Sequence, residues 1–149
     1  MPDLQHDGYK FETMLSWRGG KTGVVQNDDA PEIQVATPVD FGGAAGRWSG
    51  EALLVAGLET CMMSTFLYFA ERLKVHLEDF SSTAKAVMEM TQEGLRFTGI
   101  DVRIDAIVAD GQSREKLASA RIKEKLERYC PVSAVIKCPI GLTIDISTA

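Results

Sequence analysis

The sequence of 149 residues is poor in the residues that usually hold metal ions, with three cysteines and two histidines. Cys61, Cys130, Cys138 and His76 lie far apart, and no short C-x-x-C or H-x-x-x-H pair occurs. A metal site would need these scattered residues to converge, so we expect no bound metal. With so few cysteines, the chemistry that each thiol could carry out is considered individually.

The sequence also lacks an excess of positive charge. Its 16 Lys and Arg residues face 21 Asp and Glu residues, which gives a formal net charge of −5. No stripe of basic residues is available to displace counterions from phosphate, so a nucleic-acid partner is not expected. Residues 1–8 are polar and acidic and do not resemble a signal peptide. A cytoplasmic location is therefore expected, where a thiol is more often catalytic or inert than part of a structural disulfide.

A long uninterrupted hydrophobic run is missing as well. Residues 52–70 are nearly long enough to cross a bilayer. Glu59, Thr60, Ser64 and Thr65 interrupt the run, and no basic cluster flanks it. The pattern favours a buried helix of a soluble protein, without a membrane partner.

No internal repeat, low-complexity tract or linker divides the chain. Apolar residues make up 45% and charged residues 25% of the sequence, which is ordinary for a globular protein. The length suits one domain with its own core, so residues 1–149 are expected to form a single domain.

The first third of the chain has the pattern of an antiparallel meander. Residues 9–17 alternate large apolar and polar side chains, and Gly-rich or Asn/Asp turns separate them from strands expected near residues 24–26 and 32–37. Residues 38–48 then read as an irregular loop.

A helix is expected from about residue 50 to about residue 73. Ser49 is a good N-cap, and Glu51 places negative charge in the first turn, where it suits the helix dipole. This helix is apolar almost all round, so it needs cover on nearly every side. One chain of this size rarely supplies that cover, which indicates a partner chain.

The remaining pattern predicts two strands, a helix and two further strands. The ranges are 83–92, 96–110, 113–129, 132–136 and 142–146. Ala118, Ile122, Leu126 and Tyr129 form the apolar stripe of the helix, which Pro131 ends. This order of elements predicts a segregated α+β fold.

Two cysteines stand out as candidate redox groups. Cys61 lies within the apolar helix, and Cys130 follows the amphipathic helix 69 residues later. An apolar setting disfavours a thiolate, so a reactive Cys61 requires a nearby cation. The dipole at a helix C-terminus disfavours a Cys130 thiolate, which makes Cys130 a better resolving thiol than nucleophile.

Simpler interpretations exist for each of these residues. A cysteine in an apolar helix is usually a small hydrophobic side chain, and Cys138 reads as packing. Glu51 could be only a helix-dipole carboxylate, and it precedes Cys61 by ten residues, too far for a base acting on the thiol. Met62, Met63 and Phe66 are most simply core, although with Phe41 they could form apolar walls beside Cys61.

Several segments together resemble the OsmC/Ohr family. They are Trp17-Arg18-Gly19-Gly20, Phe41-Gly42-Gly43, the segment from Trp48 to Leu54, Cys61 within its helix, and Cys130-Pro131-Val132-Ser133. The resemblance covers nearly the whole chain. It implies an intertwined α+β homodimer whose antiparallel sheets pack around long, buried central helices.

The resemblance also implies a function, the thiol-dependent reduction of organic hydroperoxides. In that scheme Cys61 attacks, Cys130 resolves the product as a disulfide, and Glu51 holds an arginine against the sulfur. An external dithiol restores the thiols, and no bound cofactor is needed. The competing hypothesis is a dimer that binds a small apolar ligand or senses oxidation without fast turnover.

The identity of the activating cation stays open. Lys21 occupies the place where the hydroperoxide-resistance branch of the family carries arginine, and Ser49-Gly50-Glu51 replaces its usual Asn-Pro-Glu. Arg18 is favoured, because Gly19 and Gly20 allow its loop to approach closely and a guanidinium can hold a carboxylate with two bonds. Lys21 is the second candidate, and Arg47 is a further basic residue in the loops that precede the helix.

Overall fold

The computed structural model describes residues 8–149. Residues 1–7, on which the signal-peptide expectation largely rests, lie outside the described residues. The chain forms two compact units, Met1–Leu54 and Val55–Ala149, and each is described by itself. The expectation of a single domain stays a prediction.

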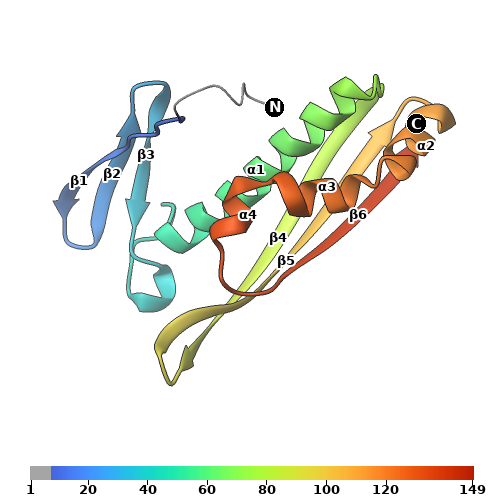
Figure 1. Cartoon of the computed structure of the whole chain (residues 1–149). Helices are drawn as coiled ribbons and strands as arrows, with labels where there is room; N and C mark the ends of the chain where they lie inside the picture. Colours follow the sequence, from blue (N-terminus) through green and yellow to red (C-terminus); the bar gives the residue numbers. More distant parts are fainter. Residues whose placement is uncertain (1–7) are drawn as a thin grey trace. The chain divides into compact units, whose positions relative to one another are not determined.

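The first unit contains the predicted meander (Figure 1). Its strands β1 (Met14–Gly19), β2 (Thr22–Asn27) and β3 (Ala30–Ala36) pair antiparallel in the order β1-β2-β3. Strand β1 begins at Met14, five residues later than the alternation suggested. Met14 already pairs with Gln26, one residue before the end of β2, so β2 offers no partner to residues 9–12.

The loop after β3 is held by close backbone contacts rather than by regular structure. It contains a short 3-10 helix, η1 (Val39–Phe41), and an isolated bridge that pairs Val35 with Trp48. A Cβ atom at Gly43 would lie 1.5 Å from the carbonyl oxygen of Thr37, so only glycine fits there.

Helix α1 (Gly50–Arg72) confirms the long helix expected from the sequence. Its N-cap is confirmed too, because the Ala52 N–H donates to Ser49 Oγ at 3.1 Å. Only one stripe is buried within the chain, formed by Leu58, Met62, Phe66 and Ala70. Among residues 8–149, α1 is the one helix long and apolar enough to cross a membrane by length and composition.

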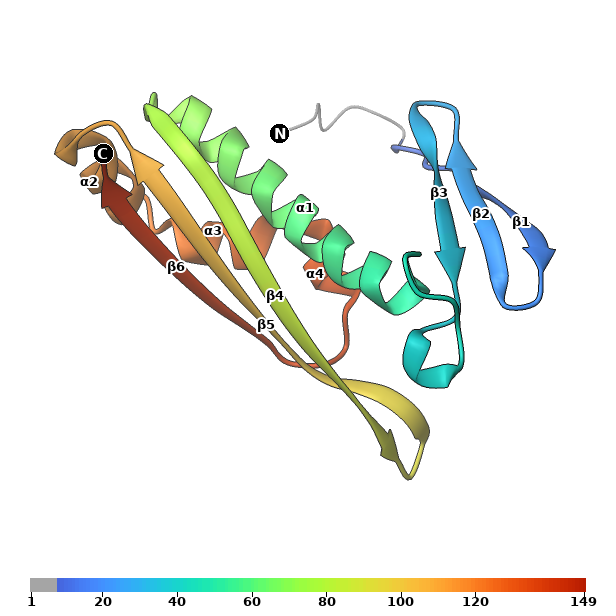
Figure 2. The same ribbon diagram turned by 180° about the vertical axis from the view of Figure 1, so that it is seen from behind.

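The second unit is a three-stranded sheet covered on one face by helices (Figures 1 and 2). Strands β4 (Leu77–Thr91) and β5 (Gly94–Val108) form a long antiparallel hairpin, and β6 (Ile140–Thr148) pairs with β5 in parallel. The buried side chains of β5 alternate with Asp101, Arg103 and Asp105, which face away from the core. The α+β fold class is confirmed, with a parallel β5–β6 pair as a departure from the expected antiparallel pairing.

The core of this unit lies between the sheet and the helices. The fully buried members include Phe66 from α1, Ile104 from β5, and Leu117 and Leu126 from the helices that follow β5. Each fully buried apolar side chain of this size contributes roughly 1.5–3 kcal/mol relative to exposure. Cys130 is buried in the same cluster, so the core itself fixes the position of this thiol.

The predicted helix over residues 113–129 is wrong in detail, because two helices occupy this region. Helix α2 (Gly111–Ser119) and helix α3 (Ile122–Tyr129) are separated at Arg121, whose φ of 53° is left-handed. The break changes the rotational phase, so Leu117 is buried in place of the predicted Ala118.

The strand predicted over residues 132–136 is also wrong. These residues belong mostly to a short helix, α4 (Pro131–Val135), with Pro131 at its start. Proline suits the first turn of a helix, because its missing N–H would have no intrahelical acceptor there. The β-branched side chains of Val132 and Val135 favoured a strand locally, and the proline outweighed them.

Candidate active site around Cys61 and Cys130

The fold brings Cys61 and Cys130 together. The Cys130 thiol donates to the Cys61 sulfur with 2.9 Å between the two Sγ atoms, although 69 residues separate them in sequence. Both are free thiols. A disulfide bond is about 2.05 Å long, so a shift of less than about 1 Å separates the pair from bonding distance.

Cys130 is held at a junction between two helices. It follows the last residue of α3 as the C-cap and precedes Pro131 of α4 as the N-cap. Its backbone N–H donates to the Leu126 carbonyl at 3.1 Å, and Ser133 Oγ donates to its carbonyl at 2.9 Å. With 1% of its surface exposed, Cys130 meets Cys61 within the fold rather than meeting bulk solvent.

Cys61 lies on α1 and is half-buried. Removal of its thiolate from water, together with its interactions with the neighbouring Cys130 thiol, raises the pKa of the Cys61 thiol from 9.0 to about 11. The expectation that the apolar helix disfavours the thiolate is therefore supported. At neutral pH this environment holds Cys61 as a thiol unless a cation acts on it.

Two groups in the second unit act in the opposite direction on this pKa. The backbone N–H of Val132 and the hydroxyl of Thr65 both favour the thiolate of Cys61. Thr65 follows Cys61 by four residues on α1, and its hydroxyl also donates to the Cys61 carbonyl at 2.9 Å. Neither residue was predicted from the sequence to act on Cys61. For Thr65, the four-residue spacing from Cys61 on a helix was a usable signal.

The candidate cations belong to the first unit. Lys21 Nζ donates to the Phe41 carbonyl at 2.5 Å, and Arg47 Nη1 donates to Gln34 Oε1 at 3.1 Å. Arg18 lies in β1 between Trp17 and Gly19, where the pairing with β2 shifts by one residue. Its exposed guanidinium makes no hydrogen bond or ion pair with any residue from 8 to 149. Of these three side chains, Arg18 is therefore the one whose charged group has no hydrogen-bond partner among the described residues.

Glu51 lies in the first turn of α1, as predicted. Its carboxylate makes no ion pair with Arg18 or Lys21 in the described part of the chain. The role that the family resemblance implies for Glu51, holding an arginine, stays a prediction.

The apolar side chains expected as walls of the site divide into three groups. Met62 and Phe66 point into the core and are 1% and 0% exposed. Met63 is 37% exposed on α1, and Phe41 belongs to the first unit. Met62 and Phe66 are therefore packing residues in this chain, as their simpler interpretation held.

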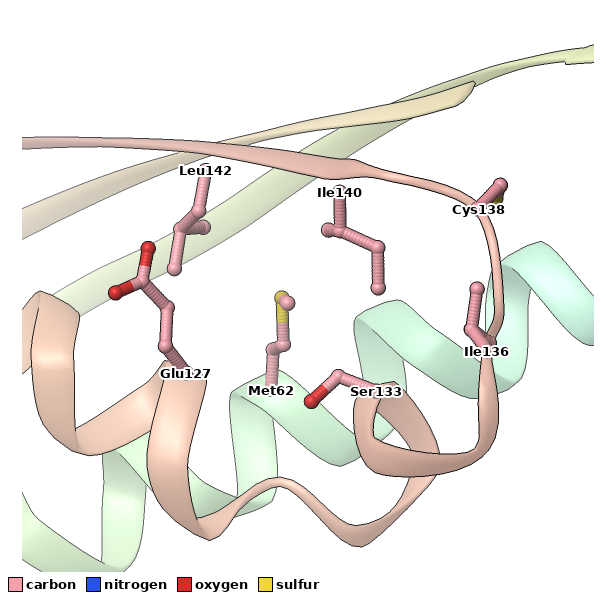
Figure 3. Close-up of a pocket in the computed structure, with 7 residues that line it drawn as sticks. All are labelled: Met62, Glu127, Ser133, Ile136, Cys138, Ile140 and Leu142. Atoms are coloured by element: carbon pink, nitrogen blue, oxygen red, sulfur yellow. The ribbon is translucent and has the colours of Figure 1, made fainter. Parts of the chain in front are cut away.

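A separate cavity of about 260 Å³ lies among α1, α3, α4 and β6 (Figure 3). Its lining combines apolar side chains with one carboxylate and one hydroxyl: Met62, Glu127, Ser133, Ile136, Cys138, Ile140 and Leu142. Cys138 thus lies at a cavity wall and is packed against the core, in agreement with its expected packing role. Within residues 8–149 no group of three His, Cys, Asp or Glu side chains could hold a metal ion.

Comparisons with known proteins place the chain in a family and support its fold. The family model described as OsmC-like protein matches residues 42–145. An OsmC-like protein of unknown function from Vibrio cholerae has the same fold, with a TM-score of 0.84, 12% identity, and coverage of 93% of this chain and 100% of that chain.

Two further solved structures are similar. An organic hydroperoxide resistance protein OsmC from Legionella pneumophila has a TM-score of 0.69 and 23% identity, covering 94% of this chain and 99% of its own. An organic hydroperoxide resistance protein from Elizabethkingia anophelis has a TM-score of 0.68 and 24% identity, covering 100% of both chains. At these identities the likeness shows the fold. No curated protein matches the chain.

Proposed function

This chain belongs to the OsmC-like protein family, and from that premise we propose that it reduces organic hydroperoxides with the thiol of Cys61 and resolves the product with Cys130. The observation that supports this most is the pair of free thiols in contact at 2.9 Å. Two proteins with the same fold bear the name organic hydroperoxide resistance protein, which supports a role in peroxide stress.

The proposed chemistry needs only groups at this site, a peroxide and a thiol reductant. The Cys61 thiolate attacks the distal peroxide oxygen, the O–O bond breaks, and the substrate leaves as its alcohol after taking up a proton. Cys61 is then a sulfenic acid, and the Cys130 sulfur displaces its hydroxyl group as water to form the Cys61–Cys130 disulfide. An external dithiol reduces this disulfide and is itself oxidised, which returns both thiols.

The site is also proposed to need a cation. Burial keeps the pKa of Cys61 high, so attack near pH 7 requires positive charge close to the sulfur. Arg18 is the first candidate, because it stands at the irregular point of β1 and has no partner among residues 8–149. A β-bulge commonly redirects a side chain, which suits this role. Lys21 is the second, with Glu51 as the carboxylate that would orient the cation.

A homodimer is the proposed assembly, working in the cytoplasm. Helix α1 buries only one stripe within the chain, while Leu54, Met63 and Leu67 are 37%, 37% and 40% exposed. Burying apolar surface gains roughly 25 cal/mol per Å², so a second copy is a favourable cover for these exposed side chains. In that assembly the peroxide and the dithiol are the small-molecule partners.

The proposal is tested by mass spectrometry after one equivalent of an alkyl hydroperoxide. Peptide mapping should show a Cys61–Cys130 disulfide and leave Cys138 as a free thiol. Cys61→Ser should abolish peroxide consumption, and Cys130→Ser should stop the reaction at a trapped sulfenic acid. Normal consumption by Cys61→Ser would show that the proposed mechanism is wrong.

The second candidate function is the binding of a small apolar ligand without fast turnover. The cavity beside α4 favours it, because ligand sites usually combine apolar walls with a few polar groups, and this lining contains both. Peroxide treatment separates the two functions. A binding protein would keep both thiols, whereas a peroxidase loses Cys61 and Cys130 together within one turnover.

A further inference from the structure

Groups from two elements lie near the Cys61 sulfur. The Cys130 sulfur is 2.9 Å away and disfavours its charged form, whereas the Val132 N–H and the Thr65 hydroxyl favour that form. Val132 lies at the second position of α4, where a backbone N–H has no intrahelical acceptor. The segment that carries the resolving thiol therefore also carries a donor for the attacking one.

Thr65 is the side chain among these donors that can change its partner. Its hydroxyl donates to the Cys61 carbonyl oxygen at 2.9 Å, the usual local bond of a threonine in a helix. A hydroxyl group carries one proton and rotates to the strongest acceptor in reach. An ionised sulfur close to that hydroxyl is a stronger acceptor than a carbonyl oxygen, because bonds to charged groups are the strong ones.

Two other hydroxyl groups on α1 can be compared with that of Thr65. Thr60 donates to the Ala56 carbonyl at 2.8 Å, and Ser64 donates to the Thr60 carbonyl at 3.0 Å. All three hydroxyl groups therefore make the same local bond on α1. Among them, Thr65 follows Cys61 by four residues, so the two side chains are neighbours on the helix surface, and its hydroxyl is the one that lowers the pKa of the Cys61 thiol.

We propose that Thr65 is a positioning residue for Cys61, its hydroxyl turning from the Cys61 carbonyl oxygen to the Cys61 sulfur once the thiol has lost its proton. This inference rests on the proposed function of Cys61 as the attacking thiolate. The hydroxyl and the Val132 N–H then hold the sulfur from two sides, with Cys130 beside it. The proton transfer needs no group beyond solvent, since Thr65 keeps its own proton throughout.

The test is the pH profile of Cys61 alkylation by iodoacetamide, followed on the Cys61 peptide by mass spectrometry. Thr65→Val keeps the branched shape and removes the hydroxyl. It should move the midpoint upward and slow alkylation below the midpoint roughly three- to tenfold, the effect of one hydrogen bond. Thr65→Ser restores a hydroxyl and should return the profile toward that of the wild type.

Thr60→Val is the matched control, because it removes the same kind of helix bond from an exposed hydroxyl that donates to the Ala56 carbonyl, away from the carbonyl and sulfur of Cys61. It should leave the midpoint unchanged, even if it lowers stability. An unshifted midpoint in Thr65→Val, or an equal shift in Thr60→Val, would overturn the role of Thr65. If Thr65→Val does not fold, Thr65→Ala compared with Thr65→Ser gives the same contrast.

Alkylation does not depend on turnover, so the two hypotheses can fail separately. If Thr65→Val shifts the pH profile but peroxide does not consume the Cys61 thiol, then Thr65 stabilises the thiolate but the proposed peroxide reduction is wrong. Peroxide consumption through Cys61 with an unshifted profile would leave the proposed function intact and overturn the role of Thr65.

Discussion

Removing the cation that activates Cys61 should slow its reaction at neutral pH by about three orders of magnitude. With a pKa of about 11, about one Cys61 in ten thousand is ionised at pH 7, a hundredfold less than for a thiol with the ordinary value of 9.0. A cation about 4 Å from the sulfur, at an effective dielectric constant of about 20, stabilises the thiolate by about 4 kcal/mol. That energy lowers the pKa of Cys61 enough to raise its ionised fraction at pH 7 about a thousandfold.

The assay compares the pH profile of Cys61 alkylation in wild type, Arg18→Ala, Lys21→Ala and Arg47→Ala. If Arg18 is the cation, Arg18→Ala should move the midpoint upward, toward the value of about 11 that burial favours. Lys21→Ala should give a smaller shift, and Arg47→Ala, whose guanidinium is bonded to Gln34, should give almost none. Each variant is read on the Cys61 peptide, so alkylation of the other two cysteines does not enter.

Two results would refute parts of this reasoning. A larger upward shift in Lys21→Ala than in Arg18→Ala would assign the cation to Lys21, the residue at the family's arginine position. A wild-type midpoint near 11 that none of the three substitutions moves would show that Cys61 is not activated by these cations. Ligand binding would then be the better-supported function.

Two further predictions concern assembly and stability. Light scattering should give a dimer of twice the chain mass of 16.3 kDa, because the exposed apolar face of α1 needs cover, and a stable folded monomer would contradict this. Leu126→Ala should lower the free energy of unfolding by about 2–5 kcal/mol in urea titrations, since Leu126 is 0% exposed. Val135→Ala, at a position 75% exposed, should change it by less than about 0.5 kcal/mol, and equal effects would contradict the described core.

Local patterns were sufficient to predict most elements of this fold. The alternation along residues 100–108 predicted β5 with its buried face, and Ser49 predicted the start of α1. These signals are local, because each depends on neighbours within one or two turns. Elements whose form depends on distant packing were harder to predict, and β6 is an example, since its parallel pairing with β5 has no local signal.

The errors have identifiable causes. The helix break at Arg121 could not be predicted from a glycine, because the left-handed position that usually favours glycine is occupied by arginine here. Helix α4 was predicted as a strand because valine favours strands, and the effect of Pro131 at the start of a helix was not considered. In the site, the pairing of Cys61 with Cys130 came from the family resemblance, because a separation of 69 residues carries no periodic signal.

The contact between two thiols so far apart in sequence gives oxidation a mechanical consequence. A disulfide at this contact would join residues 69 positions apart and close a large loop of the unfolded chain. The loss of freedom in that unfolded chain corresponds to about 4 kcal/mol at 25 °C. The oxidised protein would therefore melt at a higher temperature and resist proteases longer than the reduced protein. In the proposed catalytic cycle, the chain would alternate between a cross-linked, more stable form and a reduced, less stable form.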